Sequence, residues 1–147
     1  MAVSRLIVGI TGASGAAYGV AALKALRAAG IETHLVISKS GQITTSHELA
    51  MSLTDVAALA DVVYKIGDVA AAISSGSFQT TGMLVAPCSI RTLSEIASGV
   101  TSSLLTRAAD VVHPTRRLFC GGLRGEPARA RQLPLGSSTR NSPAALI

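Results

Sequence analysis

Gly-Ile-Thr-Gly-Ala-Ser-Gly-Ala-Ala-Tyr-Gly, at residues 9–19, is a turn of small residues between an apolar run at 6–8 and a helical pattern that begins near Ala16. A backbone this free of side chains can approach a phosphate group closely, with the N–H groups of the helix start pointing at it. A glycine-rich phosphate loop needs this order of strand, turn and helix. The sequence therefore predicts phosphate or nucleotide binding here, and the alternative is a tight strand-to-helix turn without a ligand.

Length and composition predict one cytoplasmic domain. A chain of 147 residues has the usual size of a single domain with a real core. Although 48% of the residues are hydrophobic, no run approaches the roughly 20 apolar residues of a membrane span, and the first ten residues do not resemble a signal peptide. We expect no membrane partner. Cys88 and Cys120 lack any paired spacing, which argues against a disulfide framework and a zinc site, so no metal is expected.

The basic charge is confined to the end of the chain. Up to residue 110 the acidic and basic residues balance, whereas residues 111–147 hold six arginines against one acid, which accounts for the net charge of +5. Four of the five prolines lie there too. We divide the single domain, 1–147, into a body at 1–112 and a divergent Arg/Pro/Gly-rich tail at 113–147, for which we expect disorder or irregular packing rather than a strand. No aromatic series accompanies the arginines beyond Phe119, so we expect no nucleic-acid partner.

Hydrophobic periodicity in the body predicts an α/β fold. Short apolar runs alternate with longer amphipathic stretches, as in parallel strands joined by crossover helices. Strands are predicted at 5–10, 32–37, 64–66 and 82–86. Helical segments are predicted at 16–29 (ended by Gly30), 40–51, 55–63 (capped by Thr54), 68–74, 92–97 and 104–112. The expected architecture is a three-layer αβα, flavodoxin/Rossmann-like open parallel sheet, truncated or altered at its C-terminal end.

Three predicted strand-to-helix junctions are rich in small hydroxyl residues, at 11–15, 38–40 and 87–92. Ligands of open parallel sheets collect at the carboxyl ends of the strands, and hydroxyl and backbone donors suit phosphate and ribityl oxygens. A dinucleotide enzyme would carry an acid at the end of its second strand, but here Ser38-Lys39 stands there, and Glu32 lies at the opposite end. The three junctions therefore favour a mononucleotide.

Five motifs in this chain resemble the UbiX-type flavin prenyltransferases. They are Arg-Leu-Ile-Val-Gly-Ile-Thr-Gly-Ala-Ser-Gly at 5–15, Leu-Val-Ile-Ser-Lys at 35–39, Ile-Ser-Ser-Gly-Ser-Phe at 73–78, Ala-Pro-Cys-Ser-Ile-Arg-Thr-Leu at 86–93 and Thr-Arg-Ala-Ala-Asp-Val-Val at 106–112. The resemblance covers about residues 4–112. It implies an enzyme that binds FMN and joins a dimethylallyl group, from its phosphate ester, to N5 and C6 of the reduced flavin. It also implies a homo-oligomer, commonly a dodecamer, whose prenylated FMN serves a UbiD-type decarboxylase.

The resemblance also implies the site residues. Ser14 is the catalytic candidate, close to the reacting flavin edge. The expected FMN contacts are Gly12, Ala13, Ser14, Ser38, Ser89, Ile90, Arg91, Thr92 and Arg124. For the segment 74–77, an exposed loop and a part of the active site both remain open. Cys88 and the three histidines are interpreted as packing or surface residues, because no activating partner is near in sequence.

From residue 113 onward the chain departs from the family pattern. Arg124 falls where the family has its flavin-binding arginine, but Gly125 replaces the acid that follows it, and the later Tyr and basic residue that hold the prenyl phosphate have no counterpart. An alternative function is therefore an FMN-binding or oligomer-forming protein without turnover.

Overall fold

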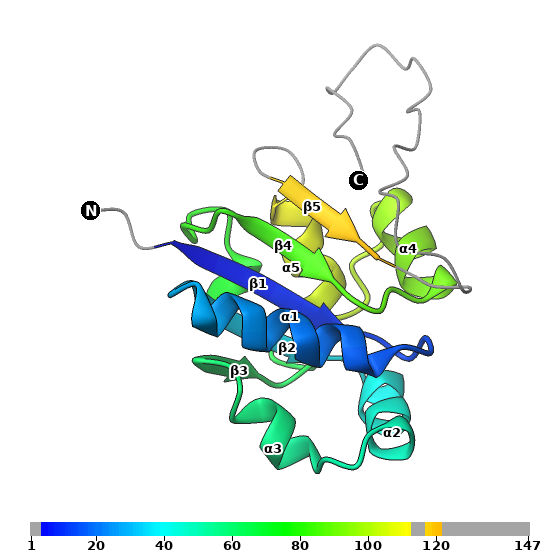
Figure 1. Ribbon diagram of the computed structural model, residues 1–147. Coiled ribbons are helices and arrows are strands. Elements are labelled where there is room, and N and C mark those ends of the chain that lie inside the picture. The colour runs from blue at the N-terminus through cyan, green and yellow to red at the C-terminus, as the bar shows by residue number, and fades with distance from the viewer. Residues whose placement is uncertain (1–3, 113–116, 122–147) are drawn as a thin grey trace.

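A parallel sheet of five strands organises the described part of the chain (Figure 1). The computed structural model describes residues 4–112 and 117–121. Its elements follow one another as β1 (Arg5–Ile10), α1 (Ala16–Ala28), β2 (Glu32–Ile37), α2 (Lys39–Glu48), α3 (Leu53–Ala57), β3 (Val62–Tyr64), η1 (Ala72–Ser74), β4 (Gly82–Val85), α4 (Ile90–Ala97), α5 (Leu104–Val112) and β5 (Arg117–Cys120). This alternation confirms the predicted α/β class.

The strands lie in the order β3-β2-β1-β4-β5, and all pairs are parallel. The chain builds outward from β1 in one direction through β2 and β3, then returns to place β4 on the other side of β1. Such a reversal of strand order opens a crevice at the carboxyl ends of the strands that flank it. In this fold the crevice position lies between the ends of β1 and β4.

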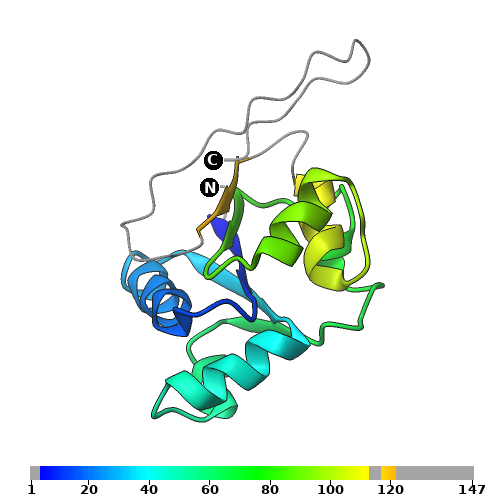
Figure 2. The ribbon, with the colours of Figure 1, turned by 90° about the vertical axis from the view of Figure 1, so that its right-hand side faces the viewer.

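Two separate hydrophobic clusters cover the two faces of the sheet. Neighbouring residues of β1 point to opposite faces, so Ile7 joins the cluster beneath α5 and η1, and Val8 joins the cluster beneath α1 and α3. Figure 2 shows α1 on one side of the sheet and the α4–α5 pair on the other. The predicted three-layer αβα architecture is thus confirmed.

Predicted helix boundaries are right for α1 and wrong for α3. Helix α1 ends at Ala28, and Gly30 follows with a φ of 69°, the left-handed backbone that favours glycine after a helix. Helix α3 is capped by Ser52 rather than Thr54, because Ser52 and Asp55 form a reciprocal capping box one turn earlier. The helix stops at Ala57, because the chain then turns to enter β3.

The third strand begins earlier than predicted, and the fifth was not predicted. Val62–Tyr64 pairs with β2, two residues before the predicted 64–66. Within the tail, Arg117–Cys120 forms β5 beside β4, so the expectation of a tail without a strand is wrong there. Pairing with a preformed neighbouring strand supplies hydrogen bonds that local sequence does not reveal. In the described ranges, no helix is long and apolar enough to cross a membrane.

Candidate functional site

The structure brings the three hydroxyl-rich junctions to one edge of the sheet. Parallel register aligns the ends of the strands, with Ile10 beside Ile37 and Gly9 beside Val85. The backbone N–H of Ser38 donates to the carbonyl of Ile10 at 2.9 Å, which holds the second junction against the first. The predicted convergence at the carboxyl edge is therefore confirmed as an arrangement of the chain.

Thr11 joins the first junction to the third. Its buried hydroxyl donates to the carbonyl of Pro87 at 2.6 Å and accepts the backbone N–H of Ser89 at 2.8 Å. Both bonds cross the reversal point between β1 and β4. A hydroxyl that donates and accepts at once fixes the two loops relative to each other, because leaving either buried partner unpaired costs free energy.

Gly12 lets the second junction pack directly against the first. A Cβ placed on Gly12 would lie 2.6 Å from both Cβ and Oγ of Ser40, closer than atoms can approach. Thr44, one turn further along α2, donates its hydroxyl to the carbonyl of Gly12 at 3.1 Å. Ser38 caps α2 by accepting the N–H of Gly41 at 2.9 Å, and its hydroxyl lies 3.2 Å from that of Ser40. The result is a backbone-lined hollow bordered by hydroxyls.

Ser14 is exposed and lies beside a carboxylate that the sequence did not single out. Glu48, at the end of α2, accepts the backbone N–H groups of Gly15 and Ala16, both at 2.9 Å. Those two bonds, and a further one from the Ser14 hydroxyl, hold the pKa of Glu48 below its usual range. The N–H groups predicted to hold a phosphate thus have a protein acceptor in Glu48. No sequence spacing announced this contact, because Glu48 reaches the turn through the packing of α2 on α1.

The third junction places Ser89, Ile90, Arg91 and Thr92 at the start of α4. Ser89 caps the helix, accepting the N–H of Thr92 at 3.2 Å and donating to its hydroxyl at 3.0 Å. Ile90 is 77% exposed. The Arg91 side chain is exposed, and its Nε donates to Glu95 at 3.0 Å. This junction therefore offers hydroxyls, one exposed apolar side chain and one cation.

Other predicted residues fall elsewhere. Arg124 lies outside the described residues. The segment 74–77 leads into Phe78, whose ring packs 5.0 Å from that of His34 at the amino ends of the strands. Within one chain that segment is therefore remote from the three junctions. Glu32 also lies at the amino edge, as predicted.

Cys88 is buried, in agreement with its interpretation as a packing residue. The Cys120 thiol bonded to it, together with burial, raises the pKa of Cys88. In the part of the chain that the structure covers, no group of three His, Cys, Asp or Glu side chains could hold a metal ion.

The residues at this edge suit a flavin mononucleotide. The Gly12 turn leaves backbone exposed, and Ser14, Ser38, Ser89 and Thr92 supply small polar groups around it. Hydroxyl and backbone groups of this kind bind phosphate and polyol oxygens without filling the hollow. Fold and site together define a nucleotide-binding α/β protein with its ligand at the crevice beside β1 and β4.

Comparisons with known proteins identify the family. Residues 1–130 match the Flavoprotein family, and the chain belongs to it. It is 52% identical over 131 residues to the flavin prenyltransferase UbiX of Neisseria meningitidis, covering 89% of this chain and 69% of that protein. It is 54% identical over 132 residues to UbiX of Escherichia coli K12, covering 89% and 70%.

Two solved structures share the fold and much of the sequence. AnUbiX (PadA1) in complex with FMN and dimethylallyl pyrophosphate superposes with a TM-score of 0.81 at 44% identity, covering 85% of this chain and 67% of that chain. The dodecameric FMN-dependent UbiX-like decarboxylase of Escherichia coli O157:H7 gives a TM-score of 0.80 at 50% identity, covering 82% and 67%. Both confirm the flavodoxin-like fold and the family resemblance.

Proposed function

We propose that this chain is a flavin prenyltransferase, which joins a dimethylallyl group from its phosphate ester to N5 and C6 of reduced FMN. The carrying observation is the hydroxyl-rich edge that Thr11 ties together, where its hydroxyl bonds both Pro87 and Ser89. The edge occurs in a chain 44% identical to a protein solved with FMN and dimethylallyl pyrophosphate. The reaction makes prenylated FMN.

The site residues divide the work by position. Gly12 and Ala13 present backbone to the flavin, and Ser38, Ser89 and Thr92 present hydroxyls. Ile90 offers an apolar contact, and Arg91 adds positive charge beside the departing phosphate. When bound, reduced FMN supplies the nucleophilic atoms and an electron-rich ring surface for the allyl group. Fixed donors around a leaving phosphate lower the barrier, because they need no reorganisation as charge develops.

Ser14 is the catalytic candidate of this proposal. Its hydroxyl lies against the Glu48 carboxylate, which also anchors the backbone of Gly15 and Ala16. A hydroxyl that donates to a carboxylate has its oxygen lone pairs left to face a ligand. Glu48 therefore orients Ser14 toward the reacting edge of the flavin.

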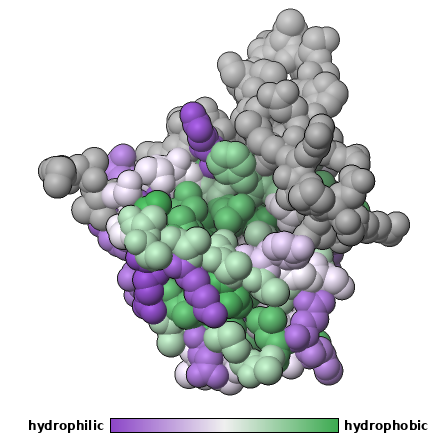
Figure 3. Space-filling model, viewed as in Figure 1, coloured by the Kyte–Doolittle hydropathy of each residue, from purple (hydrophilic) through white to green (hydrophobic). Residues whose placement is uncertain are grey.

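The proposal includes a homo-oligomer, a dodecamer by similarity to the Escherichia coli structure described as dodecameric. Tyr18, Ile43 and Ile90 are 57%, 62% and 77% exposed near the starts of α1, α2 and α4, the helices that begin at the site. Apolar side chains also cover much of the face around α1 in Figure 3. Exposed apolar groups beside a site suit its completion by a neighbouring subunit. Light scattering on the purified chain measures the subunit number.

Incubation with reduced FMN tests the function. The full chain is mixed anaerobically with reduced FMN and either dimethylallyl phosphate or dimethylallyl pyrophosphate, and the flavin is analysed by liquid chromatography and mass spectrometry. We expect a flavin heavier by one prenyl unit with at least one donor. Ser14→Ala is the matched variant, expected to keep FMN binding and lose most of the turnover.

The same experiment separates the alternative. FMN binding, measured by fluorescence quenching, without any prenylated product would support a flavin-binding protein lacking turnover. Absence of both binding and product would contradict the proposed site itself.

A UbiD-type decarboxylase is the proposed recipient of the product, and the cytoplasm is the proposed location. Adding the reaction mixture to a cofactor-free decarboxylase of that type should restore decarboxylation, and mixtures lacking the prenyl donor should not. Cell fractionation with an antibody to the chain tests the location.

A further inference from the structure

Two cysteines that are distant in sequence lie side by side at the end of the β4–β5 pair. Cys120 is the register partner of Val85. Beyond that pair, Gly121 donates its N–H to the carbonyl of Val85 at 2.8 Å, and Cys88 donates its N–H to the carbonyl of Gly121 at 2.6 Å. These bonds extend the ladder past β4 and hold the backbones of Cys88 and Cys120 in adjacent positions.

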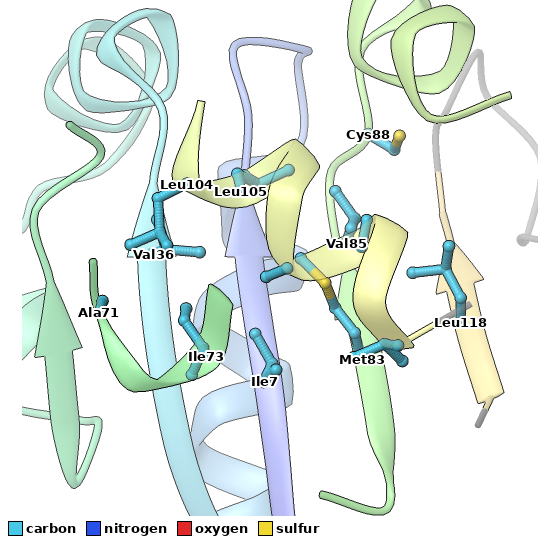
Figure 4. Close-up of a cluster of buried hydrophobic side chains, with 13 residues drawn as sticks. Ile7, Val36, Ala71, Ile73, Met83, Val85, Cys88, Leu104, Leu105 and Leu118 are labelled. Atoms are coloured by element: carbon cyan, nitrogen blue, oxygen red, sulfur yellow. The ribbon is translucent and has the colours of Figure 1, made fainter. Parts of the chain in front are cut away.

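The side chains of this pair also meet. In Figure 4 the Cys88 side chain points from the end of β4 toward β5. Both thiols are free, with Cys88 buried and Cys120 half-buried. The hydrogen bond between the thiols raises the pKa of Cys88 and lowers that of Cys120. Since the thiolate is the reactive form, Cys120 is the nucleophile of the pair and Cys88 is the buried partner.

We propose that Cys88 and Cys120 form a site of reversible disulfide formation driven by low-molecular-weight disulfides. In the first step the Cys120 thiolate attacks one sulfur of the small disulfide, forming a mixed disulfide and releasing one thiolate. In the second step the Cys88 thiol gives its proton to that released thiolate, and its sulfur attacks Cys120. The second small thiolate leaves, so two protein thiols are oxidised while one small disulfide is reduced to two thiols.

The bridge would act on the candidate flavin site. Cys88 directly precedes Ser89, whose N–H bonds Thr11 and whose hydroxyl caps α4. A covalent bond from β5 to Cys88 would restrict the third junction and tie down the edge strand. Closing a loop of this length removes entropy mainly from the unfolded chain, so oxidation should raise the melting temperature by roughly 10 °C.

Tryptic mapping of the full chain tests this inference. Trypsin places the two thiols in different peptides, residues 66–91 and 118–124. The chain is treated with oxidised glutathione, its remaining thiols are alkylated, and the digest is analysed without reductant. We expect one cross-linked pair of these peptides, lighter than their sum by two hydrogen atoms and free of glutathione. Dithiothreitol should separate the pair and reverse the rise in melting temperature.

Two variants test the order of attack. In Cys88→Ser, Cys120 should retain glutathione, because no second thiol displaces it. In Cys120→Ser, Cys88 should stay unmodified. A glutathione adduct that persists on Cys120 in the unsubstituted chain, or alkylation of both thiols after oxidation, would overturn the inference. So would a cross-link only between two copies of Cys120. The unsubstituted chain decides the outcome even where a variant does not fold.

Discussion

The two edges of the same sheet treat their polar side chains in opposite ways. At the amino edge, Arg5 donates to Glu32 at 3.0 Å, Glu32 lies 2.7 Å from His34, and His34 lies 2.9 Å from the hydroxyl of Tyr64. Phe78 closes this network by packing edge-on against His34. Side chains there satisfy one another.

At the carboxyl edge, hydroxyls bond backbone groups of neighbouring loops and stay at the surface. Ser14 is exposed, and Ser38 and Ser89 cap helices with one lone pair while remaining half-buried. The contrast teaches that the amino edge stabilises the sheet, whereas the carboxyl edge is arranged to meet a ligand. Substitutions at one edge should therefore change stability, and those at the other should change flavin binding.

The largest effect is expected at the amino edge. His34→Ala removes two hydrogen bonds and a buried ring contact, so the free energy of unfolding should fall by about 3 kcal/mol. FMN affinity of the folded protein should not change. Chemical denaturation and fluorescence quenching measure the two quantities. Tyr64→Phe, which removes one of these bonds, should cost about 1 kcal/mol. An FMN affinity lowered tenfold by either variant would remove the distinction between the edges.

Gly12→Ala should break the carboxyl edge. The new Cβ would overlap Ser40 at 2.6 Å and push α2 away from the first junction. Overpacking of this kind costs about 1–3 kcal/mol, which corresponds to an FMN affinity lower by roughly ten- to a hundredfold. Titration of FMN measures it. Adding Ser40→Gly removes the overlapping atoms and should recover part of the loss, whereas no recovery would show that the clash is not the cause.

Thr11→Val should loosen the link between the first and third junctions. Valine keeps the shape but leaves the Ser89 N–H without its acceptor, at a cost of about 1.5 kcal/mol in the free energy of unfolding. FMN affinity should fall with it. Thr11→Ser keeps the hydroxyl and should restore both. Equal behaviour of the two variants would mean that the hydroxyl does not position the loops.

The smallest effect concerns pH. The lowered pKa of Glu48 means that its contribution to stability is present above the ordinary glutamate value, about 4.3, and is lost as pH falls through the lower folded value. Glu48→Gln should flatten the acid side of a stability-against-pH curve and weaken FMN binding. Asp55→Asn is the matched control, because Ser52 lowers the pKa of Asp55 at a capping box away from the site. It should flatten the curve and leave FMN binding unchanged.

Sequence reasoning located the strands β1, β2 and β4 and the three junctions because each is encoded locally. A buried parallel strand is a short apolar run, and the small residues after it announce the turn. The same reasoning missed β5 and misplaced the cap of α3. Partner strands and a competing capping box decide those features, and neither is visible in a local window.

The chain by itself determined the α/β class, the glycine turn at 9–19 and the family motifs, because periodicity and small-residue spacing act over a few residues. Only the tertiary structure decided that Glu48 anchors the turn before α1, that Thr11 spans the reversal between β1 and β4, and that Cys88 meets Cys120. These contacts join residues from different elements. Their partners are chosen by how helices and strands pack against one another, and local sequence does not specify that packing.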